Sequence, residues 1–71
     1  MIEIWSKPQC PFCDKAENLC IQKDLEYKKY MLNVDFTRDE FMQKFPTART
    51  FPQILVDGDL VGGYTEFAAT F

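Results

Sequence analysis

The apolar and polar positions of the chain alternate at its start and then change to a helical spacing. Residues 2–6 repeat with period two and predict a short strand. From Pro11 to about Asp24, apolar side chains recur three and four positions apart, which predicts a helix with one apolar face that includes Phe12. The aromatic-rich residues 26–31 predict a second strand. Strand, helix and strand in this order form a right-handed βαβ unit with parallel strands.

A second helix follows a short connection. Thr37 and Glu40 have the spacing of a capping box, in which each side chain bonds the backbone of the other residue. The helix is therefore expected to start after Thr37 and to run to about Phe45, where Pro46 stops it.

The last third of the chain predicts a hairpin and a short helix. Residues 51–56 predict a third strand, and Asp57-Gly58 is a strong signal for a two-residue turn. Residues 59–62 then form a fourth, antiparallel strand. Gly62-Gly63 ends that strand, and residues 64–69 predict the last helix.

Length, charge and cysteine usage narrow the function classes. The 71 residues make a single domain, residues 1–71. The net charge of −3, without a run of Lys or Arg, argues against a nucleic-acid-binding protein. No apolar stretch reaches the roughly 20 residues that span a bilayer, and no signal peptide is visible, so no membrane partner is expected. Three cysteines without scaffold spacing fit a reducing compartment, and a cytoplasmic location is expected.

Cys10 and Cys13 lie where the first strand passes into the first helix. A CxxC pair at such a position is typical of redox or metal chemistry. The helix start offers free N–H groups and a partial positive charge, and Pro11 fits its first position. The amides of Phe12 and Cys13 are expected to point at the Cys10 sulfur. Lys7 adds a nearby cation, so these features together favour a Cys10 thiolate.

An alternative interpretation is that Cys10 and Cys13 form half of a zinc site. Zinc takes four ligands, and the chain has one further cysteine, Cys20, and no histidine. Only sharing between two chains would complete the site, so no metal is expected. Cys20 falls on the apolar side of the first helix and is expected in the core. The aromatic residues expected in the core are Trp5, Phe36, Phe41, Phe45 and Phe67.

Three motifs resemble those of a glutaredoxin. They are the CPFC stretch Cys10–Cys13, the Thr50-Phe51-Pro52 stretch that opens the third strand, and the Gly62–Glu66 stretch that opens the last helix. Their separations, with the Asp57-Gly58 turn between the last two, are specific, and the resemblance covers essentially the whole chain. It implies an α/β, thioredoxin-like fold, with a four-stranded mixed sheet of order 2-1-3-4 flanked by three helices.

The resemblance also implies the chemistry of the cysteines. Cys10 matches the exposed nucleophile and Cys13 the less exposed resolving thiol, so the two form a redox-active disulfide. Pro52 matches the family's cis-proline, which leaves the Phe51 backbone free to pair with an extended peptide. In glutaredoxins this peptide is glutathione.

The resemblance further implies where glutathione binds. Its γ-glutamyl carboxylate would meet the amides of Tyr64 and Thr65 at a helix start. Its glycine carboxylate would meet Lys7 and Arg49, and Phe12 would form the apolar edge of the groove. Phe12 and Phe51 stand where relatives more often carry tyrosine and valine. The implied glutathione-binding residues are Lys7, Phe12, Arg49, Thr50, Phe51, Pro52, Gly63, Tyr64 and Thr65.

The implied activity is that of a glutathione-dependent dithiol–disulfide oxidoreductase. Such a monomer would reduce protein disulfides and glutathione mixed disulfides in electron transport and cell redox homeostasis, with ribonucleotide reductase as a familiar family partner. Two alternatives stay open. One is a dimer that bridges a [2Fe–2S] cluster, against which Pro11 counts. The other is a redoxin fed by thioredoxin reductase, against which Lys7, Arg49 and the Gly62-Gly63-Tyr64-Thr65 element count.

Overall fold

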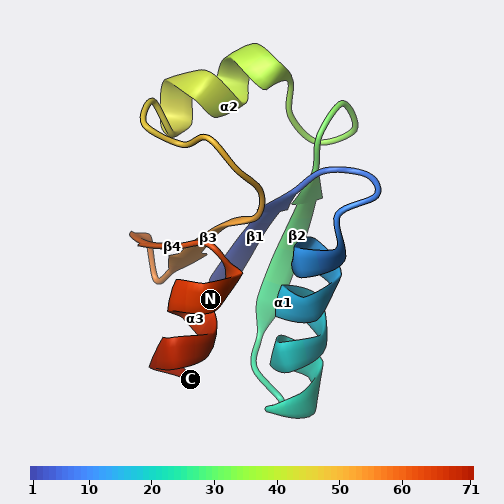
Figure 1. Ribbon diagram of the computed structural model, residues 1–71, viewed down its shortest axis with the longest axis vertical. Coiled ribbons are helices and arrows are strands. Elements are labelled where there is room, and N and C mark those ends of the chain that lie inside the picture. Colours follow the sequence, from blue (N-terminus) through green and yellow to red (C-terminus); the bar gives the residue numbers. More distant parts are fainter.

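A computed structural model describes residues 1–71 and contains the seven elements that the sequence pattern predicts (Figure 1). Their order along the chain is βαβ, α, ββ, α. Each boundary lies within two residues of its predicted place. The elements are β1 (Ile2–Ser6), α1 (Pro11–Gln22), β2 (Tyr27–Met31), α2 (Arg38–Lys44), β3 (Gln53–Val56), β4 (Asp59–Gly62) and α3 (Tyr64–Thr70).

The four strands form one mixed sheet of order β2-β1-β3-β4, which confirms the expected topology. β1 pairs in parallel with β2, where Ile4 lies opposite Lys29. On its other side β1 pairs antiparallel with β3, where Trp5 lies opposite Gln53. β3 and β4 form the hairpin predicted from Asp57-Gly58. Because β1 has a paired strand on each side, the segment after it, which carries Cys10, starts from the interior of the sheet rather than from an edge.

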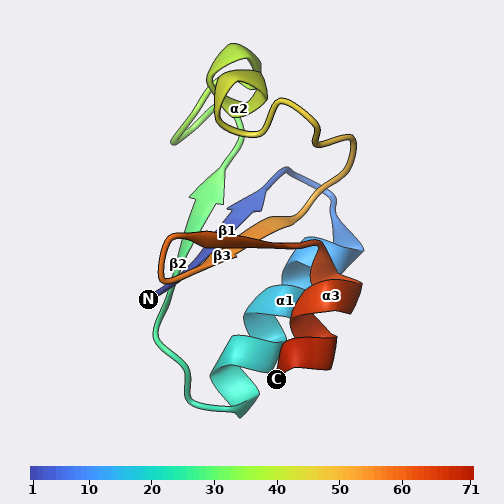
Figure 2. The same ribbon diagram turned by 90° about the vertical axis from the view of Figure 1, so that its left-hand side faces the viewer.

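Helices cover both faces of the sheet. α1 and α3 lie side by side against one face, whereas α2 lies beyond the carboxyl ends of β1 and β2 and packs on the other face (Figure 2). The core under α1 and α3 consists of Ile2, Ile4, Ala16, Cys20, Ile54 and Phe67. The core under α2 consists of Phe36, Phe41, Phe45 and Leu55.

Most of the residues expected in the core are buried, but Trp5 is not fully enclosed. Cys20, Phe36, Phe41, Phe45 and Phe67 are all buried, as predicted. The ring of Trp5 stacks on Tyr30 with centroids 4.7 Å apart and also contacts Phe36 and Phe45, and the ammonium of Lys44 lies 5.3 Å from its centroid. Trp5 thus packs against the core under α2 but stays partly exposed.

Local backbone chemistry explains where the element boundaries differ from prediction. α1 ends at Gln22 rather than Asp24, because Asp24 has a left-handed φ of 56° and Leu25 donates its N–H back to Cys20. β3 begins at Gln53 rather than at residue 51, because Pro52 has no N–H to donate to the sheet.

The capping box at the start of α2 is present as predicted. The N–H of Thr37 donates to Glu40 Oε1 at 2.8 Å, and the N–H of Glu40 donates to Thr37 Oγ1 at 3.2 Å. None of the three helices has the length and apolar character needed to cross a bilayer.

Candidate active site

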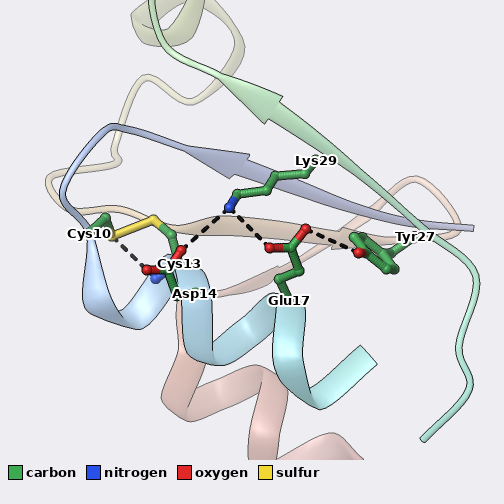
Figure 3. A network of polar contacts seen from close by, with 6 residues as sticks. All are labelled: Cys10, Cys13, Asp14, Glu17, Tyr27 and Lys29. Carbon is green, nitrogen blue, oxygen red and sulfur yellow. Dashed lines mark hydrogen bonds and ion pairs between the residues drawn. A yellow bond between two sulfur atoms is a disulfide. The ribbon is translucent and has the colours of Figure 1, made fainter. Parts of the chain in front are cut away.

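Cys10 and Cys13 are joined by a disulfide at the start of α1, with Cα atoms 5.2 Å apart (Figure 3). Cys10 is the N-cap residue in extended conformation, and Pro11 occupies the first helical position. The N–H of Cys13 donates to Cys10 Sγ at 3.2 Å, as the sequence predicted. The expected second donor, the amide of Phe12, makes no such bond. One helix-start amide therefore points at the sulfur that would carry the thiolate charge.

The expected exposure of Cys10 is wrong for this disulfide form. Only 7% of Cys10 is accessible, against 1% of Cys13. Cys10 is buried because its sulfur is turned inward to bond Cys13. Cys10 still lines one of the two grooves described below, whereas Cys13 lines neither of them. The order of accessibility thus agrees with a nucleophile at Cys10, although neither side chain is exposed.

A groove of about 550 Å³, called here the first groove, runs between the segment before β3 and the start of α3. The Phe51–Pro52 peptide in its wall is cis, as the resemblance implied. No group of the chain hydrogen-bonds to the N–H or C=O of Phe51. Its backbone is therefore free to pair with an extended chain laid in the groove.

The start of α3 provides free amides at the other wall of the first groove. Gly63 is the N-cap residue and has no side chain to cap the helix. The first intrahelical bond is made by the N–H of Phe67, which donates to Gly63 O at 3.0 Å. The N–H groups of Tyr64 and Thr65 consequently have no intrahelical partner, and they suit an anion.

A second groove, of about 660 Å³, adjoins the first on the α2 side of Cys10. Lys7 and residues 9–12 line it on one side and Leu32 and α2 on the other, with residues 48–51 between them. Lys7 and Cys10 line this groove only, whereas Pro52, Gly63, Tyr64 and Thr65 line the first groove only. The residues that line both grooves are Phe12, Ala48, Arg49, Thr50 and Phe51.

Phe12 does not contribute to the apolar core face of α1. Its side chain is 52% exposed, and its ring lies 6.0 Å from that of Tyr64 across the first groove. The ammonium of Lys15 covers the Phe12 ring at 5.0 Å. Phe12 thus lines the groove edge, as the resemblance implied, instead of the core under α1 and α3.

The comparisons with known proteins agree with this architecture. The profile of the family Glutaredoxin matches residues 2–61. Glutaredoxin 1 of Escherichia coli is 36% identical over 73 residues, which covers 93% of this chain and 86% of that protein.

The chain belongs to the glutaredoxin family.

Solved structures share the fold of this glutaredoxin. Glutaredoxin 1 from Francisella tularensis, complexed with cacodylate, superimposes with a TM-score of 0.83 at 22% identity, covering 97% of this chain and 88% of that one. A buckwheat glutaredoxin–glutathione complex gives a TM-score of 0.82 at 20% identity, covering 97% and 66%. The fold is thioredoxin-like, and the Cys10–Cys13 pair makes this glutaredoxin a thiol–disulfide oxidoreductase.

Glu66 lines the first groove; the sequence placed it in the motif that opens the last helix, but not among the implied glutathione-binding residues. Its side chain folds back over Gly62, where an added Cβ would lie 3.3 Å from the carboxyl group. Glu66 is in the same helical turn as the free amides of Tyr64 and Thr65. The signal was its position three residues after Gly63, which directs a side chain toward the helix start. The carboxylate of Glu66 can bind a cationic group of a ligand, and the free N–H groups beside it can bind an anionic group.

A polar network lies on the seam between α1 and β2, one residue beyond the disulfide (Figure 3). Lys29 Nζ donates to Glu17 Oε1 at 3.2 Å and to Asp14 Oδ1 at 3.4 Å, and the Tyr27 hydroxyl donates to Glu17 Oε2 at 3.0 Å. Burial disfavours the charged lysine, but the bonds to Glu17 and Asp14 outweigh it and raise the pKa of Lys29. The bond to Glu17 raises the pKa of Tyr27. This network ties the helix that carries the cysteines to the sheet.

The third cysteine takes no part in the site. Cys20 is fully buried, and burial raises the pKa of its thiol. No group of three or more His, Cys, Asp or Glu side chains is placed to hold a metal ion.

Proposed function

We propose that this glutaredoxin takes its electrons from glutathione and reduces protein disulfides and glutathione mixed disulfides. The observation that carries the proposal is the first groove, whose lining residues include Phe51, with its unpaired backbone, and Tyr64 and Thr65, with their free amides. Cys10 lines the adjoining second groove. The buckwheat glutaredoxin, which was solved as a complex with glutathione, supports the proposal at the level of the shared fold.

The two grooves match the functional groups of glutathione one by one. The backbone of its cysteine can pair with Phe51 as an added strand. Its γ-glutamyl end carries a carboxylate, which suits the amides of Tyr64 and Thr65, and an ammonium group, which suits Glu66. Its glycine carboxylate suits a cation, and Arg49 lines both grooves. Lys7 offers a second cation in the adjoining groove.

With a glutathione mixed disulfide, the reaction runs in two exchanges. The Cys10 thiolate attacks the glutathione sulfur, the substrate S–S bond breaks, and the protein thiolate leaves. A second glutathione thiolate then attacks the sulfur of the bound glutathione. Oxidised glutathione leaves, and Cys10 returns to the thiolate, which the N–H of Cys13 stabilises.

With a protein disulfide, Cys13 resolves the intermediate. Cys10 first forms a mixed disulfide with the substrate and releases one substrate thiolate. Cys13 then attacks the Cys10 sulfur, releases the second substrate thiolate and forms the Cys10–Cys13 disulfide. Two glutathione molecules reduce this disulfide and leave as oxidised glutathione. The proposal includes a monomer in a reducing, cytoplasmic compartment, with ribonucleotide reductase as one candidate substrate.

Coupled turnover tests the choice of reductant. We expect NADPH consumption with glutathione and glutathione reductase, and none with thioredoxin reductase alone. The Glu66→Gln variant should raise the KM for the glutathione mixed disulfide several-fold, because it loses the partner of the ammonium group. Glu26→Gln, which makes the same change at an exposed position on the β2 side, should leave KM unaltered. Turnover with thioredoxin reductase but not with glutathione would overturn the proposal, and visible absorbance of the purified protein would favour the cluster-binding alternative.

A further inference from the structure

Ser6 carries a fully buried hydroxyl group that hydrogen-bonds to no group of the chain. The other buried polar side chain, that of Gln53, donates from Nε2 to Thr50 O at 2.9 Å. The carbonyl of Ser6 is satisfied, because it accepts from the N–H of Leu32 at 2.9 Å. A buried hydroxyl without a partner costs free energy in this disulfide form, and a partner that becomes available in another redox form would recover it.

The side chain of Ser6 lies on the face of the sheet that α1 and α3 cover. The buried residues Ile2, Ile4 and Ser6 alternate along β1 with the less buried Glu3 and Trp5. Ile2 and Ile4 belong to the core under α1 and α3, and side chains two positions apart on a strand share a face. Ser6 is the last residue of β1, so its hydroxyl lies on this face at the carboxyl end of the strand.

The side chain of Cys13 comes to the same end of the sheet from the helix. The buried residues of α1 are Cys13, Ala16 and Cys20, and their spacing puts them on one helical face. Ala16 and Cys20 pack in the core with Ile2 and Ile4. Figure 1 shows α1 starting beside the carboxyl end of β1 and running back along it, so the first turn of α1 lies over the end of the strand.

The spacing along the two elements brings Ser6 and Cys13 into one layer. Only residues 7–10 separate Ser6 from the start of α1. Two residues along a strand advance about 6.6 Å, and three residues along a helix advance about 4.5 Å. The steps from Ile4 to Ser6 and from Ala16 to Cys13 are therefore comparable, and they run in the same direction from the shared core. Both side chains lie in the layer beyond Ile4 and Ala16.

The sulfur of Cys13 differs as an acceptor between the redox forms. In the disulfide it is bonded to Cys10, and the Ser6 hydroxyl makes no bond to it. A disulfide sulfur carries no charge and accepts weakly, whereas a thiolate accepts a charge-assisted hydrogen bond. Opening the disulfide thus turns the Cys13 sulfur into the kind of partner that the hydroxyl lacks.

We propose that the Ser6 hydroxyl donates a hydrogen bond to the Cys13 sulfur when the disulfide is open, and that Ser6 is a positioning residue for the resolving thiolate. In the resolving step the Cys13 thiol gives up its proton, its electron pair forms the bond to Cys10, and the bond between Cys10 and the substrate sulfur breaks. The substrate leaves as a thiolate and takes up a proton, so the substrate is reduced and the cysteine pair is oxidised. Ser6 keeps its own proton. The inference rests on the resolving role that the proposed function gives to Cys13, and it holds for any reductant.

The redox equilibrium of Ser6→Ala tests the inference. The substitution removes one oxygen atom, which takes a favourable bond from the open form and an unpartnered buried hydroxyl from the disulfide form. Both effects favour the disulfide. At equilibrium with dithiothreitol we expect the constant for reduction of the disulfide to fall at least about fivefold, which lowers the reduction potential by about 20 mV.

Two further variants separate the hydrogen bond from packing. Ser6→Thr keeps the hydroxyl and should keep the constant close to that of the wild type. Cys20→Ala makes a change of similar size in the core under α1 and α3, about two helical turns from Cys13, and should leave the constant unaltered. Urea unfolding of Ser6→Ala should show a less stable reduced protein and an oxidised protein at least as stable as the wild type. A packing role would lower both midpoints alike.

Kinetics tests the same bond in the resolving step. The reduced protein and an aromatic disulfide form a mixed disulfide at Cys10, and attack by Cys13 then releases a second, coloured thiolate. This second phase should be about threefold slower in Ser6→Ala, because less thiolate forms at Cys13 and its higher nucleophilicity offsets only part of that loss. Turnover of a small glutathione mixed disulfide should not change, because a second glutathione resolves that intermediate.

Several results would overturn the inference. They are an unchanged reduction constant in Ser6→Ala, an equal shift in either control variant, equal destabilisation of the two redox forms, an unchanged second phase, and an equal slowing of the small mixed disulfide. Neither dithiothreitol nor the aromatic disulfide involves glutathione. A shifted constant in Ser6→Ala together with a wild type that is inactive with glutathione would therefore refute the proposed reductant and leave the role of Ser6 intact.

Discussion

Replacing Lys29 by methionine tests how firmly the polar network holds α1 to the sheet. Methionine keeps most of the side-chain length and removes the ammonium group. Glu17 then loses the partner 3.2 Å away and Asp14 the one 3.4 Å away. Two carboxylates on one helical face are left without a cation, next to the turn that carries the disulfide (Figure 3). We expect a less stable fold.

The size of the effect follows from the exposure of the three side chains. The side chains of Lys29 and Glu17 are 21% and 29% exposed, so their pair lies between a surface ion pair, worth about 0.2–1 kcal/mol, and a buried charged hydrogen bond, worth about 1.5–3 kcal/mol. Asp14 is 69% exposed and contributes little. Lys29→Met should therefore lower the free energy of unfolding by about 1–2 kcal/mol, and Asp14→Asn by less than about 0.5 kcal/mol.

Urea unfolding of the oxidised protein measures this change. Lys28→Met is the matched control, because Lys28 is exposed and makes no ion pair. The double variant Lys29→Met/Glu17→Gln should show a coupling energy of at least about 0.5 kcal/mol. If Lys28→Met and Lys29→Met move the midpoint equally, or if the two changes at Lys29 and Glu17 simply add, the network does not hold α1 in place.

Three further changes test the fold. The pKa values of Lys29, Tyr27 and Cys20 are raised in the folded protein, so these groups contribute fully to the free energy of unfolding below their ordinary pKa values. This contribution is lost as pH rises through the raised pKa values, and we expect the urea midpoint to fall above about pH 9. A midpoint that does not change with pH in this range would contradict the expectation. Phe67→Ala leaves a cavity in the core under α1 and α3 and should lower the free energy of unfolding by about 3–5 kcal/mol. Phe71→Ala, at a side chain that is 38% exposed, should lower it by less than about 1.5 kcal/mol. Equal losses in the two variants would refute the assignment of Phe67 to the core. Thr37→Ala breaks the capping box and should cost about 1 kcal/mol by urea unfolding, and no loss would show that the box is dispensable.

The elements that could be predicted are those set by neighbouring residues. The capping box of Thr37 and Glu40, the Asp57-Gly58 turn and the proline after Cys10 each involve positions within three residues of one another. Their geometry depends little on the rest of the fold, and all of them occur as expected. β1 could also be predicted from neighbouring residues. Its alternation of apolar and polar residues places Ile2 and Ile4 on the face of the sheet that α1 and α3 cover.

The features that could not be predicted depend on residues distant in the sequence. Lys29 meets Asp14 and Glu17 only because β2 lies beside α1, and the local pattern shows simply three charged residues. The second groove exists because α2 brings Arg38 and Met42 over the end of the sheet near Cys10. Neither the hydrophobic periodicity of the sequence nor a local motif indicates that α2 lies there.

Glutathione-coupled reduction of a small mixed disulfide, with wild type, Cys10→Ser and Cys13→Ser compared side by side, decides whether Cys10 is the nucleophile of a glutathione-dependent enzyme. We expect Cys10→Ser to have no activity, because the nucleophile is lost. Cys13→Ser should keep much of the wild-type activity, because a second glutathione resolves the intermediate. Activity in Cys10→Ser, or an inactive wild type, would contradict this assignment.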